Sequence, residues 1–330
     1  MHAVGYRANL PVSDPDALLD LDLPDPVPGP HDLLVRVHAV SVNPADVQMR
    51  ARSHPGHEPR VLGFDAAGVV AGIGAQVTRF QPGDEIYYAG SMHRSGSNAE
   101  LHLVDEHIVG HKPRSLTMSQ AAAMPLTTIT AWEALFDHLR LDEASQGTLL
   151  VMGAPGGVGS MITQLARKRT GLTVIGTASR PESATWVRDM GAHTVVNHRL
   201  GLADQVLAAA PDGVGYVFSP YSAHNIEEYA KLLTPRGHIV AIDDVHNIMP
   251  LKMKSITWHW ELMFTRPIYE PADDYQHRLL EAAAALIDAG TLRTTMTRQL
   301  GPLNAATLRE AHRLVESGAT IGKLVVTVAD

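Results

Sequence analysis

The segment Gly153-Ala154-Pro155-Gly156-Gly157-Val158-Gly159 is the most informative part of the chain for predicting its fold. It directly follows an apolar run typical of a buried strand, 148–152, and directly precedes a helix-like segment, 160–167. Positions without a side chain let backbone N–H groups approach a pyrophosphate, and the new helix presents its positive end to that anion. Relative to the usual G-x-G-x-x-G pattern, Ala154 replaces the first glycine, while Gly156 and Gly159 keep the other two. Strand, turn and helix in this order predict a dinucleotide-binding turn; a purely structural turn is the alternative.

The segment around this turn, from about residue 125 to residue 270, has a regular rhythm. A short apolar run and a helix-length segment alternate about every 20 to 25 residues, which predicts a doubly wound parallel sheet with helices on both faces. The strands expected in this sheet span residues 148–152, 173–178, 194–196, 214–219, 238–242 and 256–262. The expected fold class is therefore α/β, of the Rossmann type.

The first 123 residues have a different pattern. Short β-type runs, for example 33–41 and 69–74, are separated by Gly, Pro and Asp, which predicts an irregular β domain. After residue 270, apolar spacing predicts a helix over 275–289, a second helix over 308–315 and a strand over 323–328. We therefore expect two domains.

The end of the second expected strand bears on which nicotinamide cofactor binds. NAD enzymes place an Asp or Glu there, roughly 20 residues past the turn, where it accepts hydrogen bonds from the ribose 2′-hydroxyl. Here the strand runs into Ser179, Arg180 and Pro181, with no acid at that spot. Ser179 can donate to a 2′-phosphate and Arg180 can pair with it, so the charge pattern favours NADPH over NADH. The alternative, which the nearby Glu182 supports, is that Arg180 is a solvated loop residue.

The composition excludes several classes of protein. The net charge is −8 and the basic residues are scattered, so a nucleic-acid partner is not expected. The chain has no Cys, which excludes disulfides, thiolate catalysis and Cys-ligated metal sites. No apolar run approaches the roughly 20 residues of a membrane span, so no membrane partner is expected. Because the N-terminus also lacks the pattern of a signal peptide, we expect a cytoplasmic protein.

Several motifs resemble those of the medium-chain dehydrogenase/reductase superfamily, and within it the zinc-free quinone oxidoreductase-like branch. They are Ser41-Val42-Asn43-Pro44-Ala45-Asp46, Val61-Leu62-Gly63-Phe64-Asp65-Ala66-Ala67-Gly68-Val69-Val70, Pro82-Gly83-Asp84, the glycine-rich turn and Ile321-Gly322-Lys323-Leu324-Val325. Segments 124–135 and 254–266 are similar to one bacterial subfamily, whose members are often catalogued as zinc-type alcohol dehydrogenase-like proteins. The resemblance runs from one end of the chain to the other.

This resemblance implies a particular architecture. A GroES-like β domain would comprise residues 1–123 and 272–330, and a Rossmann domain would comprise residues 124–271, with the active site in the cleft between them. It also implies a homodimer in which edge strands of two Rossmann sheets pair through 256–262. Simple core packing is the alternative for that Trp-rich stretch.

The resemblance also assigns roles to single residues. Asn43 and Asp46 are expected to line the catalytic pocket, where Asn43 could steady the substrate oxygen; a capping role is the alternative for Asp46. Where several quinone oxidoreductases carry a Tyr, this chain has Gln48, so the proton source stays open and water is one candidate. Besides the glycine-rich turn, Ser179 and Arg180, the expected cofactor residues are Thr127 and Thr130 near the carboxamide, His198 near the adenosine ribose phosphate, and Lys323.

Zinc is not expected at the family's metal position. Zinc-dependent relatives use a Cys, a His in a Gly-His-Glu run, and a third Cys or Asp. The matching positions here are Asn43, Phe64 and the neighbourhood of Met124, none of which supplies a usable ligand. His54 and His57 lack the further ligands of a closed site and are interpreted as surface loop residues.

These observations lead to one expected function and two alternatives. Without zinc to activate an alcohol, hydride acceptors that spread the resulting negative charge are favoured. The resemblance therefore implies NADPH-dependent reduction of a quinone or an α,β-unsaturated carbonyl. A metal-free alcohol dehydrogenase-like enzyme and a non-catalytic NADPH-binding sensor protein stay open.

Overall fold

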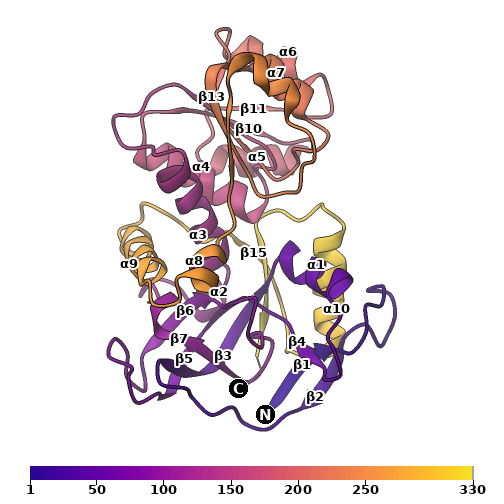
Figure 1. Ribbon diagram of the computed structural model, residues 1–330, viewed down its shortest axis with the longest axis vertical. Helices are drawn as coiled ribbons and strands as arrows, with labels where there is room; N and C mark the ends of the chain where they lie inside the picture. The colour runs from indigo at the N-terminus through magenta and orange to yellow at the C-terminus, as the bar shows by residue number, and fades with distance from the viewer. Residues whose placement is uncertain (329–330) are drawn as a thin grey trace. The chain divides into compact units, whose positions relative to one another are not determined.

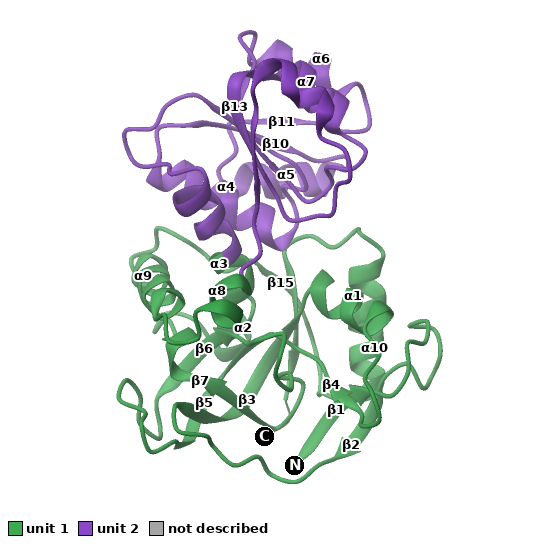
Figure 2. Ribbon diagram, in the orientation of Figure 1, with its two compact units in different colours: residues 1–129, 264–330 green, residues 130–263 purple. Residues whose placement is uncertain are grey.

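The computed structural model describes residues 1–328, and the chain divides into two compact units (Figure 2). Unit 1 comprises Met1–Ile129 and the part of the chain from Phe264 onward, and unit 2 comprises Thr130–Met263. The domain boundaries expected from the sequence, at 123/124 and 271/272, stay a prediction. No helix within residues 1–328 is long and apolar enough to cross a membrane.

Unit 2 is built on a six-stranded parallel sheet (Figure 1). Its order, β11-β10-β9-β12-β13-β14, is that of a doubly wound Rossmann sheet, so the predicted fold class is confirmed. The strands are β9 (Thr148–Val151), β10 (Thr173–Thr177), β11 (Thr194–Val196), β12 (Val214–Ser219), β13 (Leu233–Ala241) and β14 (Thr257–Trp260). The helices between them are α4 (Gly157–Arg169), α5 (Pro181–Asp189), α6 (Leu202–Ala209) and α7 (Ile226–Leu232).

The β13 strand begins earlier than the sequence predicts. Leu233 pairs with Val214 on β12, and the pairing is then irregular until it resumes at His238. Pro235 lies in this irregular stretch, and Arg236 has a φ of 64°. Because such features are typical of turns, the sequence pattern concealed the first half of the strand.

Apolar side chains hold the helices of unit 2 against its sheet. One buried cluster joins four strands to α6 and α7, through Leu150, Ile175, Val217, Ile239, Val206 and Leu232. Burying such side chains contributes roughly 1.5 to 3 kcal/mol each, so the strands are firmly fixed. Their carboxyl ends, and the loops that follow them, consequently lie along one edge of the sheet.

Unit 1 contains a seven-stranded sheet in the order β15-β16-β3-β5-β6-β8, with β7 also on β3, and a three-stranded sheet β2-β1-β4. Most neighbours are antiparallel, as expected for the irregular β domain; β15 and β16 are parallel. The strands are β1 (His2–Tyr6), β2 (Leu19–Asp22), β3 (Asp32–Val42), β4 (Arg60–Val61), β5 (Asp65–Ile73), β6 (Glu85–Ala89), β7 (Leu101–Asp105), β8 (Val109–His111), β15 (Met296–Leu300) and β16 (Lys323–Thr327).

The C-terminal segment completes the sheet of unit 1. The predicted strand at 323–328 is β16, which lies between β15 and β3 and pairs Val325 with Ser41. The two predicted helices are α9 (Tyr275–Asp288) and α10 (Ala305–Glu316). The other helices are α1 (Pro44–Arg52), α2 (Met118–Ala122), α3 (Pro125–Trp132), which continues into a π-helical turn, Glu133–His138, and α8 (Thr265–Tyr269).

Candidate functional site

The glycine-rich turn joins β9 to α4 within unit 2. Gly153 has a φ of 62°, which favours glycine, and its N–H donates to Thr177 Oγ1 at 3.1 Å. A Cβ at Gly159 would lie 2.4 Å from the carbonyl oxygen of Gly153 and 2.7 Å from Ala154 Cα. Both are backbone atoms, so glycine is needed at 159 for the helix to approach the turn this closely.

Ala154 replaces the first glycine of the usual pattern without distorting the turn. It is fully buried and faces Gly176 on β10, where an added Cβ would lie 3.1 Å from the methyl group of Ala154. The missing side chain at Gly176 therefore makes room for that methyl group. The departure from the pattern is compensated on the neighbouring strand.

The first turn of α4 leaves backbone amides available to an anion. The N–H of Gly156 donates to Gly153 O at 3.0 Å. Among the described residues, no hydrogen-bond acceptor is found for the N–H groups of Gly157, Val158 and Gly159. Three such amides at the positive end of a helix fit the pyrophosphate of a dinucleotide.

Three other predicted cofactor residues follow neighbouring strand ends. β10 and β11 pair in parallel, with Thr177 opposite Val196. Ser179 and Arg180 therefore leave the sheet beside the loop that carries His198, whose side chain is exposed. The glycine-rich turn follows β9, which pairs with β10 on the other side. The structure thus gathers these residues at one edge of the sheet.

Glu182, the acid that weakens the case for a 2′-phosphate, is paired with Arg180. Arg180 Nε lies 3.3 Å from Glu182 Oε1, and the two side chains are 38% and 60% exposed, so the ion pair is screened and weak. The backbone of Arg180 is fixed, because it caps α5 and its carbonyl accepts from Ser183 Oγ at 2.9 Å. The guanidinium group is therefore anchored at its base and accessible to solvent.

A buried polar cluster in unit 1 contains Asn43. Its Nδ2 donates to Asp65 Oδ2 at 2.9 Å and to Ser41 O at 3.2 Å. The Nζ of Lys323 donates to Asn43 Oδ1 at 2.5 Å and to Val42 O at 3.2 Å, and it lies 3.1 Å from Asp65 Oδ2. Asn43, Asp65 and Lys323 are at most 4% exposed. The buried ion pair therefore holds the amide of Asn43 in one orientation.

Asp65 and Lys323 have a structural role that the sequence motifs do not assign. Asp65 stands in a largely apolar run, and a carboxylate at a buried strand position needs a partner, which is the signal that points to it. All three ammonium hydrogens of Lys323 have acceptors within the protein. Direct contact between Lys323 and a cofactor would require one of them to be given up.

Asp46 closes the capping box of α1. Its Oδ2 accepts from the N–H of Asn43 at 2.7 Å, and its Oδ1 accepts from the N–H of Gly63 at 3.1 Å. Burial raises the pKa of Asp46 to about 7, although these N–H groups and the charge of Lys323 favour the ionised form. The capping alternative for Asp46 is thus present in the structure, while its part in catalysis stays a prediction.

Thr127 and Thr130 lie on α3 and are 2% and 5% exposed. Thr127 Oγ1 donates to Met124 O at 3.1 Å. The hydroxyl of Thr128, between them, is buried and has no hydrogen-bond partner in the described part of the chain. A buried hydroxyl in this state is a group that a bound molecule can satisfy.

The residues at the family's metal position do not fit zinc. Asn43 donates both amide hydrogens, and Asp65 accepts from Leu126 N at 2.7 Å in addition to its bonds with Asn43 and Lys323. Phe64 packs on Phe264, with ring centroids 4.6 Å apart, and offers no ligand atom. An ammonium group already neutralises Asp65, and it would repel a second cation at this place.

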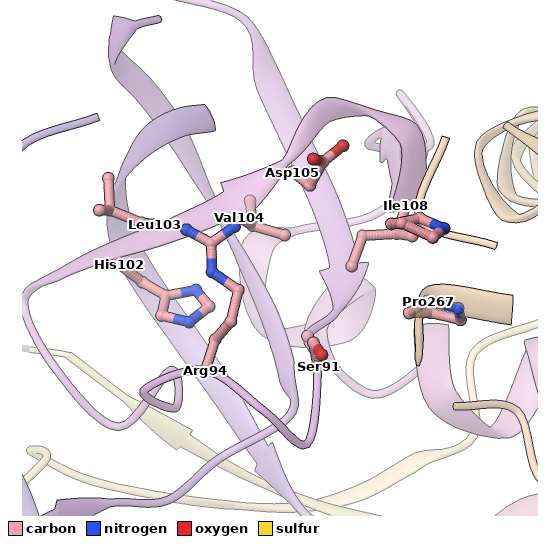
Figure 3. Close-up of a pocket in the computed structure, with 10 residues that line it drawn as sticks. Ser91, Arg94, His102, Leu103, Val104, Asp105, Ile108 and Pro267 are labelled. Atoms are coloured by element: carbon pink, nitrogen blue, oxygen red, sulfur yellow. The ribbon is translucent and has the colours of Figure 1, made fainter. Parts of the chain in front are cut away.

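A separate hollow of about 140 Å³ lies within unit 1 (Figure 3). Arg94 and His102 stand on one side of it, and Ile108 and Pro267 stand on the other. The guanidinium of Arg94 is committed to Asp32 through two bonds of 2.7 and 2.8 Å, and burial lowers the pKa of His102 to about 4. None of the site residues predicted from the sequence lines this hollow.

Comparison with known proteins agrees with the fold. The sequence families described as "Alcohol dehydrogenase GroES-like domain" and "Zinc-binding dehydrogenase" match residues 29–125 and 190–326. The chain is 38% identical to a zinc-type alcohol dehydrogenase-like protein of Staphylococcus epidermidis over 337 residues, covering 99% of this chain and 100% of the relative. It is 34% identical to a mouse quinone oxidoreductase over 230 residues, covering 68% of each chain.

Solved structures give the same picture. A Rhizobium etli protein, described as a candidate zinc-dependent alcohol dehydrogenase, is 48% identical and has a TM-score of 0.96, covering 100% of this chain and 98% of that one. The quinone oxidoreductase of Escherichia coli, solved with NADPH, shares the fold at 24% identity and a TM-score of 0.85, covering 99% of this chain and 100% of that one.

A Rossmann sheet combined with a GroES-like β unit defines a class of dehydrogenases and reductases that use nicotinamide cofactors. The chain belongs to the medium-chain dehydrogenase/reductase superfamily, in the branch of zinc-type alcohol dehydrogenase-like proteins and quinone oxidoreductases, and is an oxidoreductase of that family. The resemblance stated from the motifs is therefore confirmed.

Proposed function

We propose that this oxidoreductase reduces quinones or α,β-unsaturated carbonyls with NADPH and without a catalytic metal. The observation that carries the proposal is the buried cluster of Asn43, Asp65 and Lys323, which stands where zinc-dependent relatives bind their metal. An isolated alkoxide needs a strong electrophile, whereas an enolate or hydroquinone anion needs only modest hydrogen bonding. A bound nicotinamide would supply the hydride.

The cofactor proposal rests on the edge of the sheet in unit 2. The amides of Gly157, Val158 and Gly159 would receive the pyrophosphate. Ser179 and Arg180 would hold the 2′-phosphate, and the nearby acid Glu182 is itself paired with Arg180. His198, Thr127, Thr130 and Lys323 stay proposed cofactor residues with a smaller share of the binding.

Asn43 and Asp46 stay the residues proposed for the catalytic pocket, with a positioning role. Asn43 has no amide hydrogen left to donate, and Asp46 accepts from two backbone N–H groups. We propose that these contacts set the shape of the pocket, and that water supplies the proton the product anion needs.

The same contacts favour a second candidate function. If the polar groups of the cluster serve only to hold unit 1 together, the protein could bind NADPH as a redox sensor without turnover. A metal-free alcohol dehydrogenase-like activity is the other alternative.

One assay separates the three. The purified chain, dialysed against a chelator, is incubated with NADPH and a panel of quinones and 2-alkenals, and NADPH absorbance is followed. Loss of absorbance with these acceptors is expected, and the rate should not depend on added zinc. The reverse assay offers NADP⁺ and primary alcohols. Activity with alcohols alone contradicts the proposal, and tight NADPH binding without any turnover favours the sensor.

We further propose a cytoplasmic homodimer that forms through β14. β14 is the last strand of its sheet, and Trp260 on it is 57% exposed. A strand edge with unpaired backbone groups and an exposed aromatic side chain is suited to pairing with a second copy.

A further inference from the structure

Two imidazoles and a carboxylate converge in unit 1, and none of them is among the site residues predicted from the sequence. One ring nitrogen each of His31 and His107 and one carboxylate oxygen of Glu106 lie within 4.8 Å of one another. His31 Nδ1 is 3.0 Å from Glu106 Oε1, and the two imidazole rings have centroids 5.3 Å apart. Two His and one Glu form a ligand set that zinc accepts in proteins, with water in the fourth position.

The backbone holds this group together. β3 and β7 pair antiparallel, with Asp32 opposite Asp105, and just beyond this pair the N–H of Glu106 donates to His31 O at 3.0 Å. Two of the three side chains therefore stand on backbone that strand pairing has already ordered. An ion that bound here would not have to bring distant segments together, which lowers the entropy cost of binding.

Outer contacts orient the side chains in the manner of metal ligands. His107 Nδ1 lies 2.6 Å from Asp105 Oδ1, and Nε2 of His107 makes no hydrogen bond with the residues that the structure describes. Glu106 Oε2 accepts from the N–H groups of Thr78 and Arg79 at 2.9 and 3.0 Å, while Oε1 faces His31. A carboxylate behind the imidazole and donors behind the carboxylate fix ring tautomer and ligand direction.

Exposure gives an ion access from one side. The side chain of Glu106 is 2% exposed, whereas that of His31 is 42% exposed. The carboxylate is thus shielded at the bottom of the group, and His31 stands at its mouth. A hydrated ion can exchange there without any opening of the unit.

We propose that His31, Glu106 and His107 bind one divalent transition-metal ion of the zinc class, with water completing the coordination. The ion would fasten the start of β3 to the turn after β7. This site is separate from the position of the family's catalytic zinc, and its occupation is independent of turnover.

The test uses the full chain, stripped of metal with a chelator that is then removed. Calorimetric titration with Zn²⁺ should give one ion per chain, and Co²⁺ should produce the visible absorption of a low-symmetry site. His31→Ala and His107→Ala should each weaken Zn²⁺ binding at least tenfold. Asp105→Asn, which removes the negative charge behind the ring but keeps an oxygen that can accept from the N–H of His107, should weaken it roughly 10- to 100-fold. Zn²⁺ should raise the melting temperature of the unmodified chain and not that of His107→Ala.

The matched control is the double variant His54→Ala, His57→Ala, which removes two histidines three residues apart in another loop and should bind Zn²⁺ normally. Circular dichroism verifies the fold of each variant; where an alanine variant is misfolded, His31→Asn and His107→Gln replace it. Zn²⁺ binding that survives the loss of His31 and His107, that disappears in the control, or that is absent from the unmodified chain overturns the proposal.

Discussion

Among single residues, the pairing of buried charges determines the arrangement of the polar cluster around Asn43. The ammonium of Lys323 pairs with the buried Asp65, and together they hold the amide of Asn43. Removing one member of such a pair strands the other in a medium of low polarity, which costs several kcal/mol. Loss of either charge in this cluster is therefore expected to destabilise unit 1.

The pKa of Asp46 gives a prediction about stability. Because burial raises this pKa from 3.8 to about 7, the folded chain keeps a proton that the unfolded chain releases in that interval. Stability is then lost as the pH rises from about 4 to about 7, by roughly 1 kcal/mol per pH unit. The stability of Asp46→Asn should not show this dependence on pH. Chemical denaturation of both proteins across the interval measures it, and a difference that does not vary with pH contradicts it.

Arg180 gives a prediction about cofactor choice. A charge-assisted hydrogen bond contributes roughly 1.5 to 3 kcal/mol, so Arg180→Ala should weaken NADPH binding about 10- to 150-fold and leave NADH nearly unchanged. Fluorescence titration with both cofactors measures this. The control is Glu182→Gln, which removes the ion pair with Arg180 and should tighten NADPH binding slightly. Equal affinities for NADPH and NADH in the unmodified chain would contradict the proposal that Ser179 and Arg180 select NADPH.

Among the secondary-structure elements, the inner strands β9, β10 and β12 of the Rossmann sheet could be predicted because each is a short, largely buried apolar run. β15 could not: Met296–Leu300 is largely exposed and has no apolar alternation, and it becomes a strand only because β16 lies beside it. The capping role of Asp46 could be foreseen from its spacing to Asn43, but the pairing of Asp65 with Lys323 could not, because residues so far apart leave no local signal.

The glycine-rich turn gives a prediction that separates packing from binding. Gly159→Ala places a Cβ 2.4 Å from a backbone oxygen and should cost roughly 1 to 3 kcal/mol of stability. At Gly156 the nearest atom would be 3.4 Å away, so Gly156→Ala should change stability by less than about 0.5 kcal/mol. Its methyl group should nevertheless weaken NADPH binding, because it stands at the start of the anion site. Thermal unfolding and NADPH titration check both; equal stability of the two variants contradicts the packing argument.

At the scale of the whole molecule, the proposed dimer depends on the edge of β14. Trp260→Lys should convert a dimer into a monomer, since a charged side chain on an edge strand opposes strand pairing. Light scattering after size-exclusion chromatography measures the mass. Val27→Lys, at an 85% exposed apolar position in unit 1, is the control and should stay dimeric. If the unmodified chain has the mass of a monomer, the proposed homodimer is wrong.

The place of β16 in the sheet also bears on how the chain folds while it is being made. Unit 2 has all its residues once Met263 has been added, but β3 lacks a neighbour until Lys323–Thr327 has left the ribosome. Until then the nascent chain carries an open strand edge, and Asp65 lacks the cation that neutralises it. Unit 1 therefore cannot complete its sheet or its buried ion pair until a lysine 280 residues downstream of Asn43 has been added, and an exposed strand edge of this kind favours aggregation in the meantime.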